Sequence, residues 1–173
     1  KNLGMTGAEL DTRVRAAAET VGLRAELLNA DPFQLSGGEK RLAALAGILA
    51  MQPRVLVLDE PAAGLDPRGR RKVFSIIHSL ADTDPDMMII FVTHSMDDAA
   101  EHADNIIVLD SGMVSAHGSP REIFYSGTQS AAPEIVTLAQ LLRESGTDIG
   151  DPVKQAEAYD AVLRLIKGGD GYA

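Results

Sequence analysis

The sequence contains no cysteine, so it can form neither a disulfide framework nor a zinc site built on thiolates. That absence fits a reducing compartment. The 173 residues also contain no stretch that approaches the roughly 20 uninterrupted apolar residues of a membrane-spanning helix. The first residues, Lys1-Asn2-Leu3-Gly4, do not have the pattern of a signal peptide. We therefore expect a soluble protein, or one attached to a membrane only through partners.

Basic residues are fewer than acidic residues. The chain has 16 Lys and Arg against 25 Asp and Glu, which gives a net charge of -9. General binding to a phosphate backbone needs a clustered basic surface, so the acidic balance argues against nucleic acid as a partner. Hydrophobic residues make up 45% of the sequence, enough to bury a core, and the length allows one globular domain with a small appendage.

Apolar runs and helical patterns alternate along the middle of the chain. Strands are expected at Val55 to Leu58, Met87 to Thr93 and Asn105 to Leu109. Helical spacing follows Asp66 and again Ser95, each at a position suited to a helix cap. This order predicts an α/β fold with a parallel sheet, strands that are buried on both faces, and ligands at the carboxyl ends of the strands.

We expect three parts along the sequence. Residues 1–52 form a helical part, residues 53–127 form the sheet-bearing core, and residues 128–173 form a C-terminal helical appendage. Within the appendage, apolar residues recur at helical spacing in two stretches, 135–142 and 153–166.

The segment Ser36-Gly37-Gly38-Glu39 opens an expected helix. Serine followed three residues later by glutamate is the capping-box pattern, which is a purely structural interpretation. A cap does not explain why two glycines occupy the first turn, where each costs about 1 kcal/mol relative to alanine. Glycines there let another backbone or a phosphate approach the N–H groups at the positive end of the helix. The segment is therefore also a candidate anion site.

Acidic residues end the first expected strand. Asp59 and Glu60 form either a polar strand end or a functional pair, in which the aspartate serves Mg²⁺ and the glutamate deprotonates an attacking water. An apolar run that ends in this pair is the Walker B arrangement. His94 ends the next strand, as a structural histidine or as a hydrogen-bond donor to a γ-phosphate. Asp66 is explained as a helix N-cap, which is compatible with a functional role.

Taken together and in this order, residues 33–112 resemble the second half of an ATP-binding-cassette (ABC) ATPase. Four motifs carry the resemblance: Leu35-Ser36-Gly37-Gly38-Glu39 resembles the signature, Val55 to Glu60 the Walker B motif, Ala63-Gly64-Leu65-Asp66 the D-loop, and Thr93-His94 the H-loop. Three weaker stretches resemble the ATPase subunits of energy-coupling-factor and cobalt-type importers: Lys1-Asn2-Leu3-Gly4, Gly64 to Arg71, and Pro133 to Val136.

The resemblance implies a P-loop NTPase-like fold and a head-to-tail pair of ATPase domains that sandwiches two ATP molecules. Residues 35–39 would contact the γ-phosphate of the ATP held by the partner, with Glu39 shaping the helix start. In the chain's own site, Asp59 would serve the Mg²⁺ shell through water, Glu60 would act as general base, and His94 would sense the γ-phosphate. The D-loop residues 63–66 would communicate across the dimer.

The resemblance also implies partners and a location. The chain would be an ATP-hydrolysing importer subunit on the cytoplasmic face of the cell membrane, without inserting into it. It would work with a second ATPase subunit, identical or different, and with a transmembrane coupling subunit. The transported substrate cannot be deduced, and cobalt, nickel and vitamins enter by analogy only.

Two other functions stay open. A chromosome-maintenance or DNA-repair ATPase would carry the same motifs but would flank the signature with long coiled coils, and no sustained heptad run is present. Alternatively, the chain is a non-catalytic module whose C-terminal helices form a dimerisation or regulatory surface.

One motif of the family is missing. No lysine follows a glycine, so the P-loop sequence Gly-x-x-x-x-Gly-Lys-Ser/Thr is absent, and no residue can be assigned to the glutamine-bearing loop. Because the chain begins with Lys within a family-like motif, we interpret it as the C-terminal portion of a longer protein, inactive alone. In the family, the P-loop strand lies between the strand ending at His94 and the strand at 105–109. Its absence predicts a gap in the sheet, so that the chain rearranges, pairs with another chain or folds only marginally.

Overall fold

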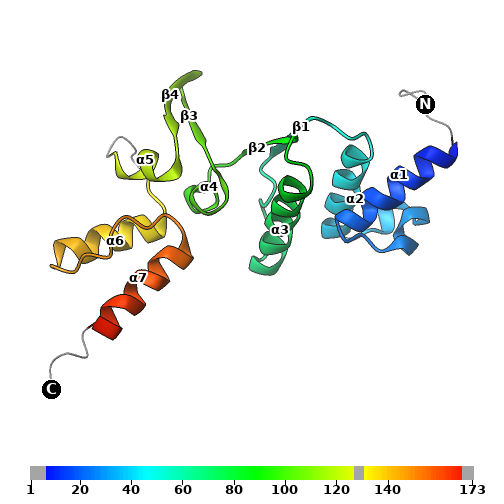
Figure 1. Ribbon diagram of the computed structural model, residues 1–173. Helices are drawn as coiled ribbons and strands as arrows, with labels where there is room; N and C mark the ends of the chain where they lie inside the picture. Colours follow the sequence, from blue (N-terminus) through cyan, green and yellow to red (C-terminus); the bar gives the residue numbers. More distant parts are fainter. Residues whose placement is uncertain (1–6, 127–130, 169–173) are drawn as a thin grey trace. The chain divides into compact units, whose positions relative to one another are not determined.

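The computed structural model describes residues 7–126 and 131–168 and divides between Val92 and Thr93 into two compact units (Figure 1). The first unit contains α1 (Gly7–Thr20), two 3₁₀ helices (Ala25–Asn29 and Pro32–Gln34), α2 (Gly37–Leu49), β1 (Val55–Asp59), α3 (Pro67–Thr83) and β2 (Met88–Val92). The second contains α4 (Met96–His102), β3 (Ile106–Asp110), β4 (Met113–Gly118), α5 (Pro120–Tyr125), α6 (Glu134–Glu144) and α7 (Gln155–Gly168).

In the first unit, β1 and β2 form a parallel pair, in register from Val55 opposite Met88 to Asp59 opposite Val92. Leu56 of β1 is only 1% exposed and joins a core with apolar residues of α1, α2 and α3. Phe74 of α3 packs edge-on against Phe91 of β2, with ring centroids 5.7 Å apart. Helices therefore cover one face of this strand pair.

The other face of the pair is open among the described residues. Successive strand side chains point to opposite faces, and those that alternate with the buried ones are exposed. Val57 is 58% exposed beside Leu56 at 1%. The open face consists of five apolar residues: Val55, Val57, Met88, Ile90 and Val92. The expectation that these strands are buried on both faces is thus wrong within the described residues, because helices pack on one side only.

In the second unit, β3 and β4 form an antiparallel hairpin. Ser111 and Gly112 at its turn both have positive φ, 51° and 78°, as a type I′ turn requires. A buried apolar cluster joins α4, α5, α6 and the segment before α7, with Ala100, Phe124 and Val136 among its members. This cluster is the core of the second unit.

The described strands form two separate two-stranded sheets, one in each unit. The expected gap in the sheet stays a prediction. The three-part division of the sequence stays a prediction. The resemblance at Lys1-Asn2-Leu3-Gly4 lies outside the described residues.

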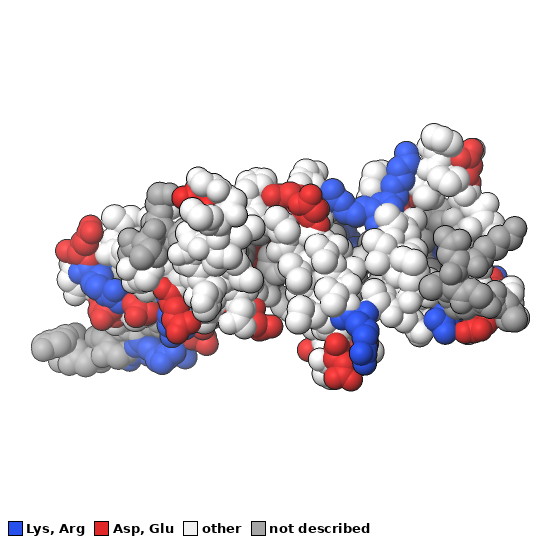
Figure 2. Space-filling model, turned by 90° about the horizontal axis from the view of Figure 1, so that it is seen from above, with Lys and Arg blue, Asp and Glu red and all other residues white. Residues whose placement is uncertain are grey.

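The described helices and surface add two observations. No helix among the described residues combines the length and apolar character needed to cross a bilayer. On the face drawn in Figure 2, Lys and Arg side chains lie in small separate groups with acidic side chains nearby.

Candidate functional site

The start of α2 is a complete capping box. Ser36 Oγ accepts a hydrogen bond from the Glu39 N–H at 3.3 Å, and Glu39 Oε2 accepts from the Ser36 N–H at 2.9 Å. The Ser36 hydroxyl also donates to Glu39 Oε2 at 2.7 Å. The structural interpretation of this segment is therefore confirmed, and the cap fixes the first turn that carries Gly37 and Gly38.

A second capping box in the same chain shows that the glycines are not part of the cap. Ser119 and Glu122 at the start of α5 repeat the same bonds, with 2.8 Å from the Ser119 N–H to Glu122 Oε2. The residues between them are Pro120 and Arg121 instead of two glycines. A capping box of the same geometry thus forms without glycine.

Gly37 and Gly38 are exposed, and no described atom lies within 4 Å of a Cβ built on either residue. Neither has a positive φ. Neither packing nor backbone conformation within the described part of the chain therefore requires glycine here. What glycine does provide is close access to the backbone N–H groups of the first turn.

Glu39 also forms an ion pair, and its pKa is lowered. Its other carboxylate oxygen accepts from Arg24 Nη2 at 2.9 Å. Hydrogen bonds from the Ser36 side chain and backbone, joined by the Arg24 contact, lower the pKa of Glu39 from 4.5 to about 2. Glu39 is therefore an anion at neutral pH, and it turns toward Ser36 and Arg24.

The Walker B pair lies at the carboxyl end of β1. Asp59 is exposed at the end of the strand, and Glu60 follows with its N–H bonded to the Val92 carbonyl of β2 at 2.9 Å. Glu60 has a φ of 47°, a left-handed conformation that costs a residue other than glycine about 1–3 kcal/mol. The strand end thus holds a half-buried carboxylate in a strained backbone.

The D-loop continues from this strained residue into α3. Gly64 has a φ of 68°, which glycine adopts without strain. Asp66 is the N-cap of α3 and accepts from the Gly69 N–H at 2.7 Å, as expected. A Cβ at Gly69 would lie 2.9 Å from Asp66 Oδ1. A side chain at position 69 would therefore require this carboxylate oxygen to shift.

Arg41 of α2 is hydrogen-bonded to the D-loop segment. The sequence analysis did not identify this residue. Its Nη1 donates to the carbonyls of Pro61 at 3.2 Å and Ala63 at 3.1 Å, and its Nη2 donates to Ala63 at 3.2 Å. The partners lie 20 and 22 residues away in the sequence, so no local pattern marks the contact. The three hydrogen bonds hold the loop after Glu60 against the first turns of α2.

The H-loop begins the second unit. Ser95 is the N-cap of α4 and accepts from the Asp98 N–H at 3.2 Å, while its own N–H donates to Thr93 Oγ1 at 3.0 Å. His94 lies between these two anchored residues and is exposed. The signature, the Walker B pair and the D-loop therefore share the first unit, and the H-loop belongs to the second.

The described residues supply too few ligands to hold a metal ion by themselves. No group of three or more His, Asp or Glu side chains among the described residues is arranged to hold a metal ion. Mg²⁺ commonly keeps several waters and binds one or two carboxylates together with substrate phosphates. An exposed Asp59 at a strand end suits this mode of Mg²⁺ binding. A site in which protein side chains alone surround the metal does not fit the described residues.

Comparison with curated proteins finds relatives along most of the chain. An energy-coupling factor transporter ATP-binding protein, EcfA2, of Clostridioides difficile is 43% identical over 96% of this chain and 60% of its own length. The EcfA2 protein of Bacillus subtilis is 40% identical over 98% of this chain and 63% of its own length. A family model described as "AAA domain, putative AbiEii toxin, Type IV TA system" matches residues 23–97.

Solved structures give the same fold. The structure of cbiO1 from Clostridium perfringens, part of the ABC transporter complex cbiONQ, has a TM-score of 0.66 at 32% identity, over 84% of this chain and 55% of that protein. A dimeric bacterial ABC transporter cassette has a TM-score of 0.59 at 28% identity, over 68% of this chain and 50% of that protein. A related structure of that cassette is a post-hydrolysis state bound to ADP and phosphate. The chain spans about 60% of the length of the curated relatives that it matches.

Proposed function

Because the chain belongs to the ATP-binding-cassette ATPases and is 40–48% identical to energy-coupling-factor ATP-binding proteins, we propose that it is a signature- and Walker B-bearing part of an importer's ATPase subunit. In this role it covers an ATP molecule held by a second ATPase subunit and contributes to the hydrolysis that moves a transmembrane coupling subunit.

One observation carries the proposal: the first turn of α2 contains glycines that the fold does not need. The cap forms without glycine at Ser119, and nothing in the described residues crowds Gly37 or Gly38. An approaching γ-phosphate needs this open first turn, because the N–H groups there and the positive end of the helix bind anions. Ser36 adds its hydroxyl beside the same turn.

We infer roles for three further residues: Asp59 would serve Mg²⁺ through water, Glu60 would be the general base, and His94 would contact the γ-phosphate. The strained conformation of Glu60 supports a functional role, because such strain persists where the surrounding structure imposes it, often at active sites. The 173 residues contain no P-loop sequence, the motif that cradles the phosphates in this family. The chain alone is therefore expected to be inactive.

Two similar structures support a proposal about partners. One similar structure is part of a transporter complex and another is a dimeric cassette. We infer that this chain pairs with a second ATPase domain and associates with the membrane peripherally, on its cytoplasmic face, through a transmembrane coupling subunit. The D-loop residues 63–66, held by Arg41, would face the second ATPase.

Complementation in trans tests the proposal. The partner is an ATPase domain of the same family with an intact P-loop and an arginine in place of its own signature serine. Neither protein alone can complete a site, but a mixed dimer joins the partner's P-loop to Ser36–Glu39 of this chain. Phosphate release should rise when the two are mixed, and this chain with Ser36→Arg should not produce the rise.

The chain offers a matched control for this assay. Glu60→Gln should leave the rescued phosphate release unchanged, because Glu60 belongs to the site that lacks a P-loop. Gly37→Ala and Gly38→Ala should lower it, because each adds a Cβ where the phosphate approaches. A mixed dimer that forms without any rescue, or a rescue that survives Ser36→Arg, would refute the proposed function.

A further inference from the structure

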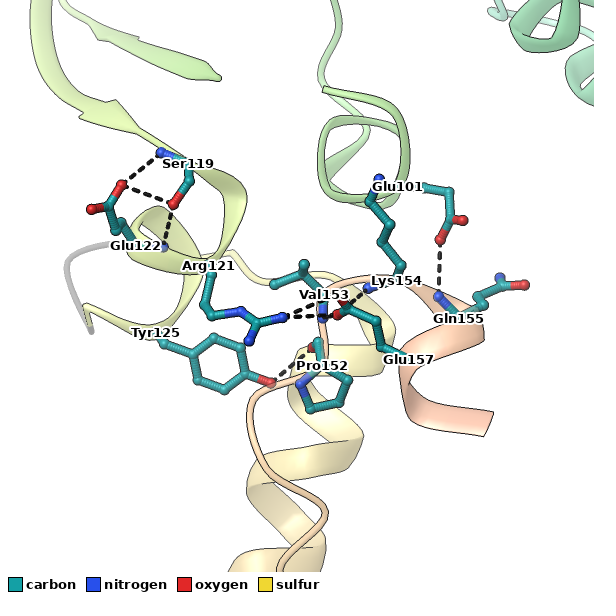
Figure 3. A network of polar contacts seen from close by, with 10 residues as sticks. All are labelled: Glu101, Ser119, Arg121, Glu122, Tyr125, Pro152, Val153, Lys154, Gln155 and Glu157. Atoms are coloured by element: carbon teal, nitrogen blue, oxygen red, sulfur yellow. Dashed lines mark hydrogen bonds and ion pairs between the residues drawn. The ribbon is translucent and has the colours of Figure 1, made fainter. Parts of the chain in front are cut away.

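The helix that follows the H-loop, α4, is bonded to both helices at the end of the chain. Asp97 Oδ1 accepts a hydrogen bond from the N–H of Glu134, the first residue of α6, at 2.9 Å. Glu101 Oε2 accepts one from the N–H of Gln155, the first residue of α7, also at 2.9 Å (Figure 3). Asp97 and Glu101 are four residues apart and lie on the same face of α4. One short helix thus caps the starts of two others.

These caps come from tertiary structure and not from the local sequence. The N-cap residue of α6 is Pro133, whose side chain makes no capping hydrogen bond. At α7, Glu157 Oε2 accepts from the N–H groups of Val153 at 2.9 Å and Lys154 at 3.4 Å, and the next N–H is bonded to α4. A carboxylate at a helix N-terminus also interacts favourably with the helix dipole. The two C-terminal helices therefore depend on α4 for part of their capping.

Further contacts hold the start of α7 in place beside α5. Arg121 forms an ion pair with Glu157 at 3.1 Å, and the Tyr125 hydroxyl donates to the Pro152 carbonyl at 2.9 Å (Figure 3). Ala100 of α4 is 1% exposed and packs in the same apolar cluster as Val136 of α6. Apolar and polar contacts thus join α4 to the C-terminal helices within one core.

The same helix follows directly on the H-loop. Ser95 caps α4 and its N–H is bonded to Thr93 Oγ1, so the residues on both sides of His94 are attached to the helix start. α4 has seven residues and is about 10 Å long, so Asp97 lies three residues and Glu101 seven residues from His94 along the chain. A shift of α4 would therefore move the backbone of His94.

We propose that Asp97 and Glu101 are positioning residues for His94, and that the C-terminal helices set the position of the H-loop through these two carboxylates. The inference rests on the proposed function in one respect, which is the role of His94 at the γ-phosphate. Neither carboxylate needs to touch the nucleotide. The appendage is then a control element for hydrolysis as well as a packed extension.

Nuclear magnetic resonance of the 173-residue chain without nucleotide tests this link. The chain has four histidines, and a His94→Gln variant identifies the ring signals of His94. In the double variant with Asp97→Ala and Glu101→Ala, amide exchange at Glu134 and Gln155 should rise by about tenfold as charge-assisted bonds are lost. The ring signals of His94 should shift at the same time. Asp104→Ala removes an exposed carboxylate just after α4 and should change neither.

Faster exchange at both amides with unchanged His94 signals would overturn the proposal, because the caps would then be structural only. Equal shifts with Asp104→Ala would overturn it too, since charge alone would explain them. If circular dichroism shows that the double variant is unfolded, Asp97→Asn and Glu101→Gln retain an acceptor oxygen and should give the same pattern more weakly. Unmoved His94 signals with raised exchange in those variants would refute the link.

The proposed function fails or succeeds separately. The complementation assay depends on Ser36–Glu39 and on a partner's P-loop, whereas this measurement uses neither nucleotide nor partner. A chain that rescues the partner but shows no coupling at His94 would refute only the further inference.

Discussion

At the scale of single residues, Glu39 makes the folded first unit sensitive to acid. Its pKa is about 2 in the folded protein against an ordinary value of 4.5, so the unfolded state binds the proton more readily. The stability that this carboxylate contributes is complete above pH 4.5 and is lost as the pH falls toward 2. Glu39→Gln should flatten the fall in unfolding free energy of the first unit across this range, measured by urea unfolding at several pH values.

The second capping box supplies the control for this titration. Hydrogen bonds from the Ser119 backbone and side chain also lower the pKa of Glu122, but that residue belongs to the other unit. Glu122→Gln should leave the acid response of the first unit intact. If Glu39→Gln leaves the pH dependence as steep as before, the Ser36 and Arg24 contacts do not stabilise the anion.

A second residue-scale prediction compares two helical glycines, one in the middle of α2 and one near the start of α3. Gly47→Ala, in the exposed middle of α2 with open space around it, should stabilise the protein by about 0.5–1 kcal/mol. Gly69→Ala should bring no such gain, because its Cβ displaces Asp66 Oδ1 and weakens the cap of α3.

The two substitutions should differ by about 1 kcal/mol in urea unfolding, which is the usual contribution of an N-cap. Removing the cap first makes the test specific. In an Asp66→Ala background, Gly69→Ala should become as stabilising as Gly47→Ala. Equal gains from both alanines in the wild-type background would show that the cap does not constrain position 69.

At the scale of elements, Arg41 couples α2 to the D-loop. Arg41→Ala should raise amide exchange at Ala63 and Leu65 by about fivefold to tenfold, because the loop carbonyls lose three hydrogen bonds. Arg41→Lys should restore only part of the protection, since an ammonium group cannot reproduce the forked geometry of the guanidinium. Mass-spectrometric or magnetic-resonance exchange measures the effect.

Lys40 is the matched control, as an exposed cation at the adjacent position of the same helix. Lys40→Ala removes the same charge without touching the D-loop and should leave exchange at Ala63 and Leu65 unchanged. Equal protection in Arg41→Ala and the wild-type protein would mean that α2 and the D-loop are held together by other contacts.

Element-scale contacts also mark the limit of what sequence reasoning predicts. Capping boxes at Ser36 and the N-cap at Asp66 were predictable because each is encoded within three residues of sequence. The Arg41 contact spans 20 or more residues, and the caps from Asp97 and Glu101 span 37 and 54. Such pairs depend on how elements pack, which no local pattern records. The roles of the signature, Walker B and H-loop residues in catalysis stay predictions.

At the scale of the whole molecule, the strand pair β1–β2 has one apolar face packed against helices and one apolar face that is exposed. The first four residues of β1, 55–58, are all apolar and give no sign that alternate residues differ. Leu56→Ala should lower the unfolding free energy by about 2–4 kcal/mol, because it leaves a cavity in the core. Val57→Ala should cost less than about 1 kcal/mol, since that side chain is mostly exposed.

Urea unfolding of both variants at several protein concentrations checks these two predictions. The two costs should be independent of concentration if the face is open in the isolated chain. A large cost for Val57→Ala that grows with concentration would contradict the account, because a second copy would then cover the face.

The central claim is that Ser36 of this chain contacts the γ-phosphate of an ATP molecule held on another subunit. Vanadate trapped with Mg²⁺ and ADP occupies the γ-phosphate position and, under ultraviolet light, cleaves backbone next to it. We would mix this chain with the P-loop-bearing partner, trap, irradiate and map the cleavage by mass spectrometry. The account predicts a break in this chain at Ser36 that requires the partner's P-loop. Cleavage confined to the partner, with this chain intact in a mixed dimer, would contradict it.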